Sequence, residues 1–182
     1  YYVVVKADIN NTIFEHTGEN NNTVISATAT TITALPAIDL SVIAGDIIST
    51  TVTAGKPVNL QWTVKNNSAT PTVIPSWKDA VYLSANPVLD ANVILLSTVT
   101  INTPVAAGGT YTKTHTVTIP VDVSGNLYLL VTADKDNQQN DDVRGNNTLA
   151  LNNSNGSGQA VTITVPPPSD LVPISLFGPA QG

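Results

Sequence analysis

Acidic side chains gather in one loop late in the chain, and carboxylates are the groups here best suited to bind a metal ion. The loop lies within residues 133–148, and its carboxylates belong to Asp134, Asp136, Asp141 and Asp142. Calcium takes about six to eight oxygen ligands from carboxylates, carbonyls and water on flexible loops. Asp134 and Asp136 stand at alternate positions, so both could point toward one ion. These residues predict a calcium site.

The start of the chain carries a second version of this loop. Its candidate calcium ligands are Asp8, Asn10, Glu15 and Glu19. Neither loop has the spacing of an EF-hand or of a glycine-rich calcium repeat. Asp and Asn side chains also hydrogen-bond their own backbone and shape turns without any metal. Calcium binding and plain turn formation are therefore both open interpretations.

Other residues capable of chemistry are isolated. His16 and His115 have no second histidine or glutamate at metal-ligating spacing, which argues against a zinc site. Asp79 and Asp90 could be read as the paired carboxylates of a glycosidase, but one falls inside a predicted strand and the other follows a turn. The chain has no cysteine and no nucleophile or phosphate-binding motif. We therefore predict a protein without catalytic activity.

Asparagine sequons are frequent in the chain. The pattern Asn-x-Ser/Thr begins at Asn10, Asn21, Asn66, Asn146, Asn152 and Asn155. Such sequons also arise by chance in a chain rich in Asn and Thr. They are candidate glycosylation sites only if the source organism glycosylates its proteins.

The composition is that of an acidic β-protein. Hydrophobic residues make up 42% of the chain and charged residues only 11%, with a net charge of −6. The few Lys and Arg residues are scattered, which argues against nucleic-acid binding. No run of about 18 apolar residues predicts a membrane span, and no signal peptide is visible. The absence of Met leads us to expect a processed or excised piece of a longer chain.

The chain repeats itself at the spacing of a whole domain. Residues 1–23 align with residues 127–148, and the matched pairs include Tyr2 with Tyr128, Val5 with Val131, Asp8 with Asp134, and Asn21-Asn22-Thr23 with Asn146-Asn147-Thr148. Asp39-Leu40 likewise aligns with Asp170-Leu171. This repetition predicts a tandem array. Residues 1–36 would be the C-terminal part of one repeat, residues 39–168 a complete module and residues 170–182 the first strand of another.

The segments between turn signals have the pattern of β-strands. Predicted strands cover residues 1–8, 24–35, 39–44, 58–64, 77–84, 93–101, 111–119, 127–133 and 160–165. Alternation places Val58, Leu60, Trp62 and Val64 on one face, and the threonines of residues 111–119 on a solvated face. About seven short strands in the complete module predict an all-β, immunoglobulin-like β-sandwich. Its core should include Trp62, Val81, Leu83, Leu129 and Val131.

Several motifs follow one another in a specific order. They are WKDAVYLSANPVLDANVILL at 77–96, AAGGTYTKTHTVTIP at 106–120, GNLYLLVTADKDNQ at 125–138, GNNT at 145–148 and VPPPSDLV at 165–172. Together they resemble the CARDB family, the cell adhesion related domain found in bacteria. The matching positions are Trp77, Asp79, Val81, Tyr82, Leu83, Ser84, Leu89, Asp90, Leu95, Leu96, Gly125, Tyr128, Val131, Asp134, Asn146 and Asn147.

The resemblance implies an immunoglobulin-like sandwich, usually in tandem, in large secreted or cell-surface prokaryotic proteins. The chain departs from the family where an acidic residue often follows the strand that ends at Ser84, because Ala85 and Asn86 stand there. The family also favours two glutamates before the Asn-Asn pair. The second loop instead has two aspartates and then Arg144, so any metal site there would bind differently or more weakly.

Two kinds of function fit these observations. The first is a non-catalytic structural or adhesive module of a repetitive prokaryotic cell-surface protein or extracellular filament, which calcium could stabilise. Its partners would be neighbouring copies of the repeat, in the same chain or by strand exchange, because an open sheet edge invites added strands. The alternative is a glycan- or protein-binding module that uses Trp77 and Tyr82, or an ancillary domain of a large secreted enzyme. Neither interpretation involves nucleic acid or membrane insertion.

Overall fold

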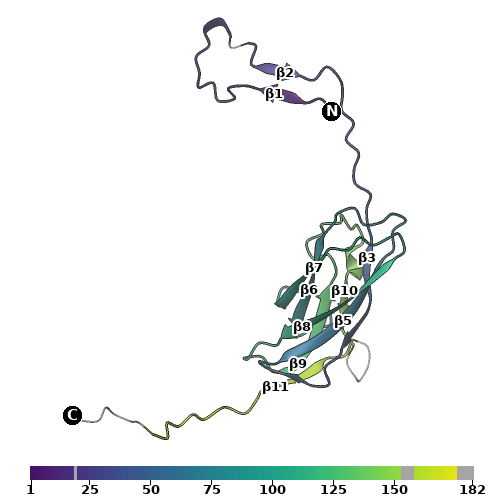
Figure 1. Cartoon of the computed structure of the whole chain (residues 1–182), viewed down its shortest axis with the longest axis vertical. Helices are drawn as coiled ribbons and strands as arrows, with labels where there is room; N and C mark the ends of the chain where they lie inside the picture. Colours follow the sequence, from purple (N-terminus) through teal and green to yellow (C-terminus); the bar gives the residue numbers. More distant parts are fainter. Residues whose placement is uncertain (19, 153–157, 176–182) are drawn as a thin grey trace, which may run out of the picture. The chain divides into compact units, whose positions relative to one another are not determined.

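The computed structural model describes residues 1–18, 20–152 and 158–175, and the chain divides into two compact units, Tyr1–Leu35 and Pro36–Gly182. The described residues form β-strands and two short 3₁₀ turns, η1 (His16–Gly18) and η2 (Arg144–Asn146). Figure 1 labels the strands of each unit except β4. The second unit is a two-layer β-sandwich, which confirms the predicted all-β, immunoglobulin-like fold class.

The two layers of the sandwich differ in size. The smaller sheet has the order β3 (Leu40–Ile47), β5 (Pro57–Asn66), β8 (Thr110–Thr118). The larger sheet has the order β4 (Val52–Thr53), β11 (Val161–Thr164), β9 (Gly125–Thr132), β6 (Trp77–Ser84), β7 (Ile94–Ile101). A further strand, β10 (Thr148–Ala150), pairs with the end of β9. Among the paired strands of the described residues, β4 and β11 run parallel and the other pairs are antiparallel.

Alternation along the strands builds the core between the sheets. In β5, Val58, Leu60, Trp62 and Val64 are at most 1% exposed, while the residues between them face outward. The larger sheet contributes the buried side chains of Leu83, Leu129 and Val131. The alternate threonines of β8 are exposed, as predicted, and Thr112, Thr114 and Thr116 hydrogen-bond to β5 side chains across the outer face. Period-two patterning therefore decides which residues face the core.

Several strands differ from the sequence prediction, including β3, which runs on to Ile47 although the pattern ends it at residue 44. The pattern predicts one long strand over residues 24–35, but β2 covers only Thr23–Ile25. Beyond the pairing of β2 with β1 (Val4–Lys6), Ser26 still contacts Val3: the Ser26 N–H donates to the Val3 carbonyl at 2.8 Å, and the Ser26 hydroxyl accepts the Val3 N–H at 3.1 Å. The short strands β4 and β10 were not predicted, since two or three residues carry no readable period.

The first unit is a hairpin that reproduces β9 and β10 in detail. Val5 pairs with Val24 in β1–β2, as Val131 pairs with Leu149 in β9–β10. The turn that follows is also the same. Asn11 N–H donates to the Asp8 carbonyl at 2.8 Å, and Asn137 N–H donates to the Asp134 carbonyl at 2.9 Å. The sequence repeat is therefore a repeat of strand register and loop conformation.

Candidate functional site

The loop expected to bind calcium is organised by Asp134, which is buried. Its two carboxylate oxygens accept the backbone N–H groups of Gln138 at 2.9 Å and Gln139 at 2.8 Å. The backbone of Asp134 has a positive φ of 42°, which Asp tolerates better than most residues. Both oxygens are therefore occupied by the turn itself.

Asp141 joins the same loop to the strand where the module begins. One oxygen of its buried carboxylate accepts the Leu40 N–H at 2.8 Å and the Asn147 side-chain amide at 2.9 Å. The other accepts the Val143 N–H at 2.8 Å. Leu40 is 101 residues away in sequence, so this carboxylate fixes the start of β3 against the loop. Its role in the structure is to satisfy backbone donors.

The remaining candidate ligands in this loop lie apart. Asp136 and Asp142 are exposed, and Asp136 forms an ion pair with its neighbour Lys135. Arg144 donates to the carbonyls of Asp134 and Lys135, which adds a positive charge at the loop. Within the described part of the chain, no three His, Asp or Glu side chains gather into a set that could hold a metal ion.

The counterpart loop in the first unit has the same construction. The Asp8 carboxylate accepts the N–H groups of Thr12 and Ile13, both at 2.8 Å, and these bonds lower the pKa of Asp8. Asn10 is exposed, Glu15 is partly exposed, and Glu19 lies outside the described residues. The structure thus shows turn geometry at both loops. The donor sets do not fit calcium as they stand, because backbone amides already occupy the carboxylates best placed to bind it.

A buried carboxylate with several hydrogen-bond donors around it lies elsewhere, at Asp79 on β6. It is completely buried, and it accepts hydrogen bonds from Trp62 Nε1 at 2.9 Å, from the Tyr111 hydroxyl at 2.8 Å and from the Asp134 N–H at 3.1 Å. Trp62 and Tyr111 lie on β5 and β8 of the smaller sheet, whereas Asp79 lies on the larger sheet. We call these four groups the Asp79 cluster. It ties the two layers together through polar contacts inside the core.

Trp77 completes the surroundings of this cluster. Its ring meets the Tyr111 ring edge-on at 5.9 Å between centroids, and its Nε1 lies 3.4 Å from the Tyr111 hydroxyl. Trp77 is fully buried, so it is not available as a sugar-binding platform. Burial and the neighbouring Asp79 charge raise the pKa of Tyr111 well above its ordinary range, so this phenol stays protonated and donates to Asp79. The cluster therefore works as a structural unit.

The pKa of Asp79 gives a testable pH dependence. Burial raises this pKa, although the surrounding donors act in the opposite direction. An unfolded Asp titrates at about 3.9, so the folded module binds the Asp79 proton more tightly than the unfolded chain does. The stabilising contribution of Asp79 is then complete below about pH 4 and declines as pH rises through the folded pKa.

We expect the melting-temperature gap between the wild type and Asp79→Asn to shrink as the pH rises above about 4, the unfolded value, through the raised folded pKa. Thermal melts of the two proteins at matched ionic strength measure this gap. A gap that widens with pH would mean that the hydrogen-bond donors around Asp79 lower its folded pKa by more than burial raises it.

The isolated candidate residues make local contacts within the fold. His115 Nε2 and the Ser97 hydroxyl are 2.9 Å apart and join β8 to β7, while His16 packs against the Phe14 ring. Asp90 accepts the Asn92 N–H and the Asn86 side-chain amide at a turn, and it is partly exposed, unlike the buried Asp79. Among the described residues, none of these side chains belongs to a group of three or more His, Asp or Glu that could hold a metal ion.

The asparagines of the sequons differ in whether the side-chain amide nitrogen, to which a glycan would be attached, is exposed or buried. Asn10 and Asn21 are exposed, whereas Asn66 is fully buried and donates to the carbonyls of Thr70, Val105 and Ala106. Asn146 and Asn152 are partly buried and donate to Asp39 and Asp46. Asn155 lies outside the described residues. Attaching a glycan to Asn66 would break three hydrogen bonds in the core.

We therefore expect any glycosylation of the folded chain to reach Asn10 or Asn21 and to spare Asn66. Peptide mapping by mass spectrometry of material from a glycosylating source measures this directly. Occupancy at Asn66 in natively folded protein would contradict the described packing, and an intact mass equal to the sequence mass would exclude glycosylation altogether.

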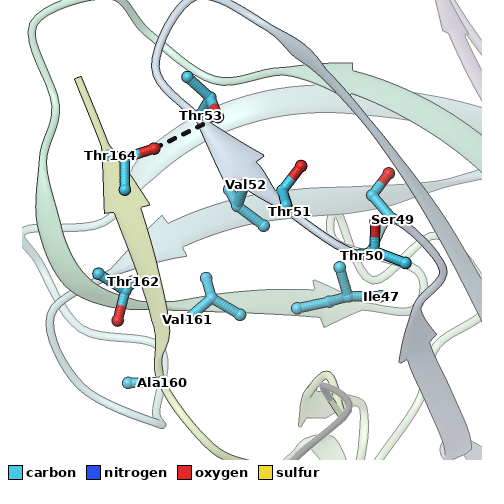
Figure 2. A pocket seen from close by; sticks show the side chains of 10 residues that line it. All are labelled: Ile47, Ser49, Thr50, Thr51, Val52, Thr53, Ala160, Val161, Thr162 and Thr164. Carbon is cyan, nitrogen blue, oxygen red and sulfur yellow. Dashed lines mark hydrogen bonds between the residues drawn. The ribbon is translucent and has the colours of Figure 1, made fainter. Parts of the chain in front are cut away.

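A groove lies where β3 leaves the smaller sheet and β4 joins the larger one. Its volume is about 380 Å³, and Figure 2 shows its lining of β-branched and hydroxyl side chains. The hydroxyls of Thr53 and Thr164 hydrogen-bond to each other across the β4–β11 pair at 3.3 Å. The Ser49 hydroxyl accepts the Asn59 N–H. Because these three hydroxyls already bond to protein groups, we interpret the groove as a gap between strands that change sheets and not as a binding site.

Two important polar residues were missed by sequence reasoning. Gln139 is fully buried, and its side-chain amide bonds to the loop before β6, with contacts to the Ile74 carbonyl at 2.7 Å and the Val73 N–H at 3.1 Å. The sequence singles out Asn66 only as a sequon. A single Gln or Asn does not form part of a repeating pattern in the sequence. Its role becomes visible only when the structure shows which distant loop it contacts.

The described residues thus form an immunoglobulin-like sandwich whose buried polar side chains serve structure. The CARDB family model matches residues 37–151, so the chain belongs to the CARDB family, a family of non-catalytic, adhesion-related domains. No relative was found among curated proteins. No helix in the described part of the chain is long and apolar enough to cross a membrane.

Solved structures with related folds include two archaeal CARDB or cell-surface domains. The CARDB domain of a Pyrococcus furiosus protein, crystallised in complex with di-metal ions, is 18% identical, with a TM-score of 0.46, and the match covers 74% of this chain and 100% of that one. A domain of a proposed cell surface protein from Methanosarcina acetivorans is 16% identical, with a TM-score of 0.47, covering 70% and 93%.

A third match lies inside an enzyme. A beta-glucosidase from Listeria innocua, in complex with isofagomine, is 14% identical, with a TM-score of 0.43, and the match covers 70% of this chain but only 17% of that one. At these identities and scores the three structures support no argument about function.

Proposed function

We propose that this chain is part of a structural and adhesive surface protein built from CARDB modules in tandem. The β1–β2 hairpin carries this proposal, because it reproduces the β9–β10 hairpin of the complete module in register and in its turn hydrogen bonds. Residues 1–36 are then the C-terminal part of a preceding repeat, residues 39–168 a complete repeat, and residues 170–182 the start of a following one. Of this last segment, residues 170–175 form no strand and residues 176–182 lie outside the described residues. Membership of an adhesion-related family supports an extracellular or cell-surface location.

An array within one polypeptide fits better than strand exchange between copies. The first unit matches β9 and β10, and Asp170-Leu171 matches the start of β3. Neither part contains a counterpart of β5, β6, β7 or β8, which supply both tryptophans and Asp79. Two copies of this segment that exchanged their ends would therefore still lack these four strands. A longer chain with successive modules supplies them all.

Electron microscopy of the native full-length protein tests this proposal. We expect a row of similar beads, each the size of one roughly 130-residue domain, joined by short linkers such as the proline run at 166–168. A single globular particle, or a filament whose subunits dissociate into 182-residue monomers, would contradict the tandem arrangement.

Calcium was the cofactor expected from the sequence, and the loop geometry favours its absence from residues 134–142. Because Asp134 and Asp141 bond to backbone amides, we expect the melting temperature to be the same, within about 1 °C, in millimolar calcium and in chelator. Asp136→Asn, which changes an exposed carboxylate that accepts no backbone N–H of the described turn, is the matched control. A calcium-dependent rise in the wild type that Asp136→Asn abolishes would restore the calcium interpretation.

A glycan-binding role has less support. Of its two candidate aromatic residues, Trp77 is fully buried and Tyr82 is only partly exposed. Sugar-binding sites need exposed aromatic faces, so we do not favour this alternative. A positive signal on a glycan array that Tyr82→Ala abolishes, with folding intact, would reverse this preference. The other alternative, an ancillary domain of a large secreted enzyme, is compatible with the tandem array.

A further inference from the structure

The hairpin of the first unit has an apolar strand with one unused edge. Within the described residues β1 pairs only with β2, so its other edge carries no neighbouring strand. Val3, Val4 and Val5 are 56%, 57% and 58% exposed. Consecutive valines that are exposed on both faces of a strand are unusual, because such residues gain most from burial in a sheet. This edge and its two faces lack a partner.

The second hairpin shows which partner fits. The residues aligned with Val3, Val4 and Val5 are Leu129, Leu130 and Val131, and these are at most 1% exposed. Their strand, β9, pairs with β10 on one edge and with β6 on the other. The antiparallel register places Leu83 opposite Leu129 and Val81 opposite Val131. A strand like β6 therefore covers the edge that is open in β1.

The turn beyond the strand adds a polar requirement. Asp79 on β6 accepts the Asp134 N–H at 3.1 Å, and the Lys78 carbonyl accepts the Lys135 N–H at 2.8 Å. The aligned donors in the first unit are the N–H groups of Asp8 and Ile9. Asp8 has the same left-handed backbone as Asp134, with φ of 40° against 42°, so its N–H has the same relation to the strand. The partner must bring an acceptor to this point.

We propose that the open edge of β1 is a docking surface for a β6-like strand of a preceding module, whose buried aspartate accepts the Asp8 N–H. The strand runs antiparallel to β1, with apolar residues opposite Val3 and Val5, in the register of Leu83 and Val81. The inference rests on the proposed tandem array and specifies its chemistry. Each module then has its own buried carboxylate, which joins its two sheets to the Asp- and Asn-rich loop after the β9-like strand. The preceding module is the one to which the β1–β2 hairpin itself belongs.

The test adds to the intact chain the strands that the hairpin lacks. A copy of residues 37–126 is placed directly before Tyr1, because Tyr1 aligns with Leu127. The added copy brings β3 to β8 and the existing hairpin completes it. Hydrogen exchange followed by NMR compares the amides of residues 3–9 in the chain alone and in the extended chain. We expect exchange to slow by at least about 100-fold on extension, since buried ladder amides open only with the module.

Matched variants test the aspartate and the apolar contacts separately. Asp79→Asn, made in the added copy only, should return the Asp8 amide to faster exchange than in the unmodified extension. Leu83→Ala, also made in the added copy only, should speed exchange at Val3 while leaving the acceptor of the Asp8 N–H in place. The β9–β10 hairpin of the original module, unchanged in every protein, is the internal reference for folding.

Two results would overturn the proposal. The first is equally fast exchange at residues 3–9 with and without the extension, while the reference hairpin stays protected. The second is protection already present in the unextended chain together with a dimeric mass, because a second copy would then occupy the edge. Beaded particles of the native protein alongside either result would keep the tandem array and reject only the strand assignment.

Discussion

Trp62→Ala is expected to lower the free energy of unfolding of the module by about 3–5 kcal/mol, the usual range for removing a large buried aromatic. Trp62 is 1% exposed at the centre of β5, and its Nε1 donates to Asp79 at 2.9 Å. The substitution therefore leaves a large cavity between the sheets and removes one donor from a buried carboxylate. Both losses act in the same direction.

Urea denaturation followed by circular dichroism measures this loss as a shift in the midpoint at unchanged slope. Trp62→Phe is the matched control, because it keeps most of the ring volume and removes the indole N–H. Its smaller loss isolates the hydrogen bond from the cavity. An unchanged midpoint in Trp62→Ala would refute the placement of this residue in the core.

Asp79→Asn is expected to destabilise the module at pH 7 by about 3 kcal/mol, although it replaces only one oxygen by an NH₂ group. One carboxylate oxygen accepts from Trp62 and Tyr111, and the other accepts from Tyr111 and the Asp134 N–H. An amide NH₂ at either position would face a backbone or indole N–H. Two donors in contact inside the core cannot both be satisfied.

A double-mutant cycle with Tyr111→Phe separates the contributions. Tyr111→Phe removes one donor and should cost about 1.5–3 kcal/mol, as for other hydrogen bonds to a charged group. The loss in the double variant should be smaller than the sum of the two single losses, because both substitutions act on the same cluster. Strict additivity would show that Tyr111 and Asp79 act independently, contrary to their 2.8 Å contact.

The sequence predicts the parts of this fold that follow from local pattern. Alternation along residues 58–64 places four side chains in the core, and every one of them is buried there. The predicted strand at 77–84 has the same bounds as β6. Periodicity works here because these strands lie in the middle of their sheets, where one face must be buried throughout.

The hydrogen-bond partners of the buried polar side chains could not be predicted from the sequence pattern. Local sequence puts Asp79 in a strand and favours a structural role, but its partners Trp62 and Tyr111 lie 17 and 32 residues away. Gln139 bonds to a loop 65 residues away. Such contacts depend on how the two sheets stack, which no single stretch of sequence encodes. The Asx-rich loops were ambiguous for a related reason, since calcium sites and tight turns use the same residue types.

The parallel β4–β11 pair has a consequence for a protein under tension. Val52 lies beside Ile163 and Thr53 beside Thr164, and the Ala54 N–H donates to the Thr164 carbonyl at 2.9 Å. A pull on β4 and β11 in opposite directions along their length would make the two strands slide past each other. All the bonds between them then bear the load together, whereas a hairpin peeled from its open end loses its bonds singly. The β4–β11 pair is thus expected to resist sliding along its own length more than peeling from one end.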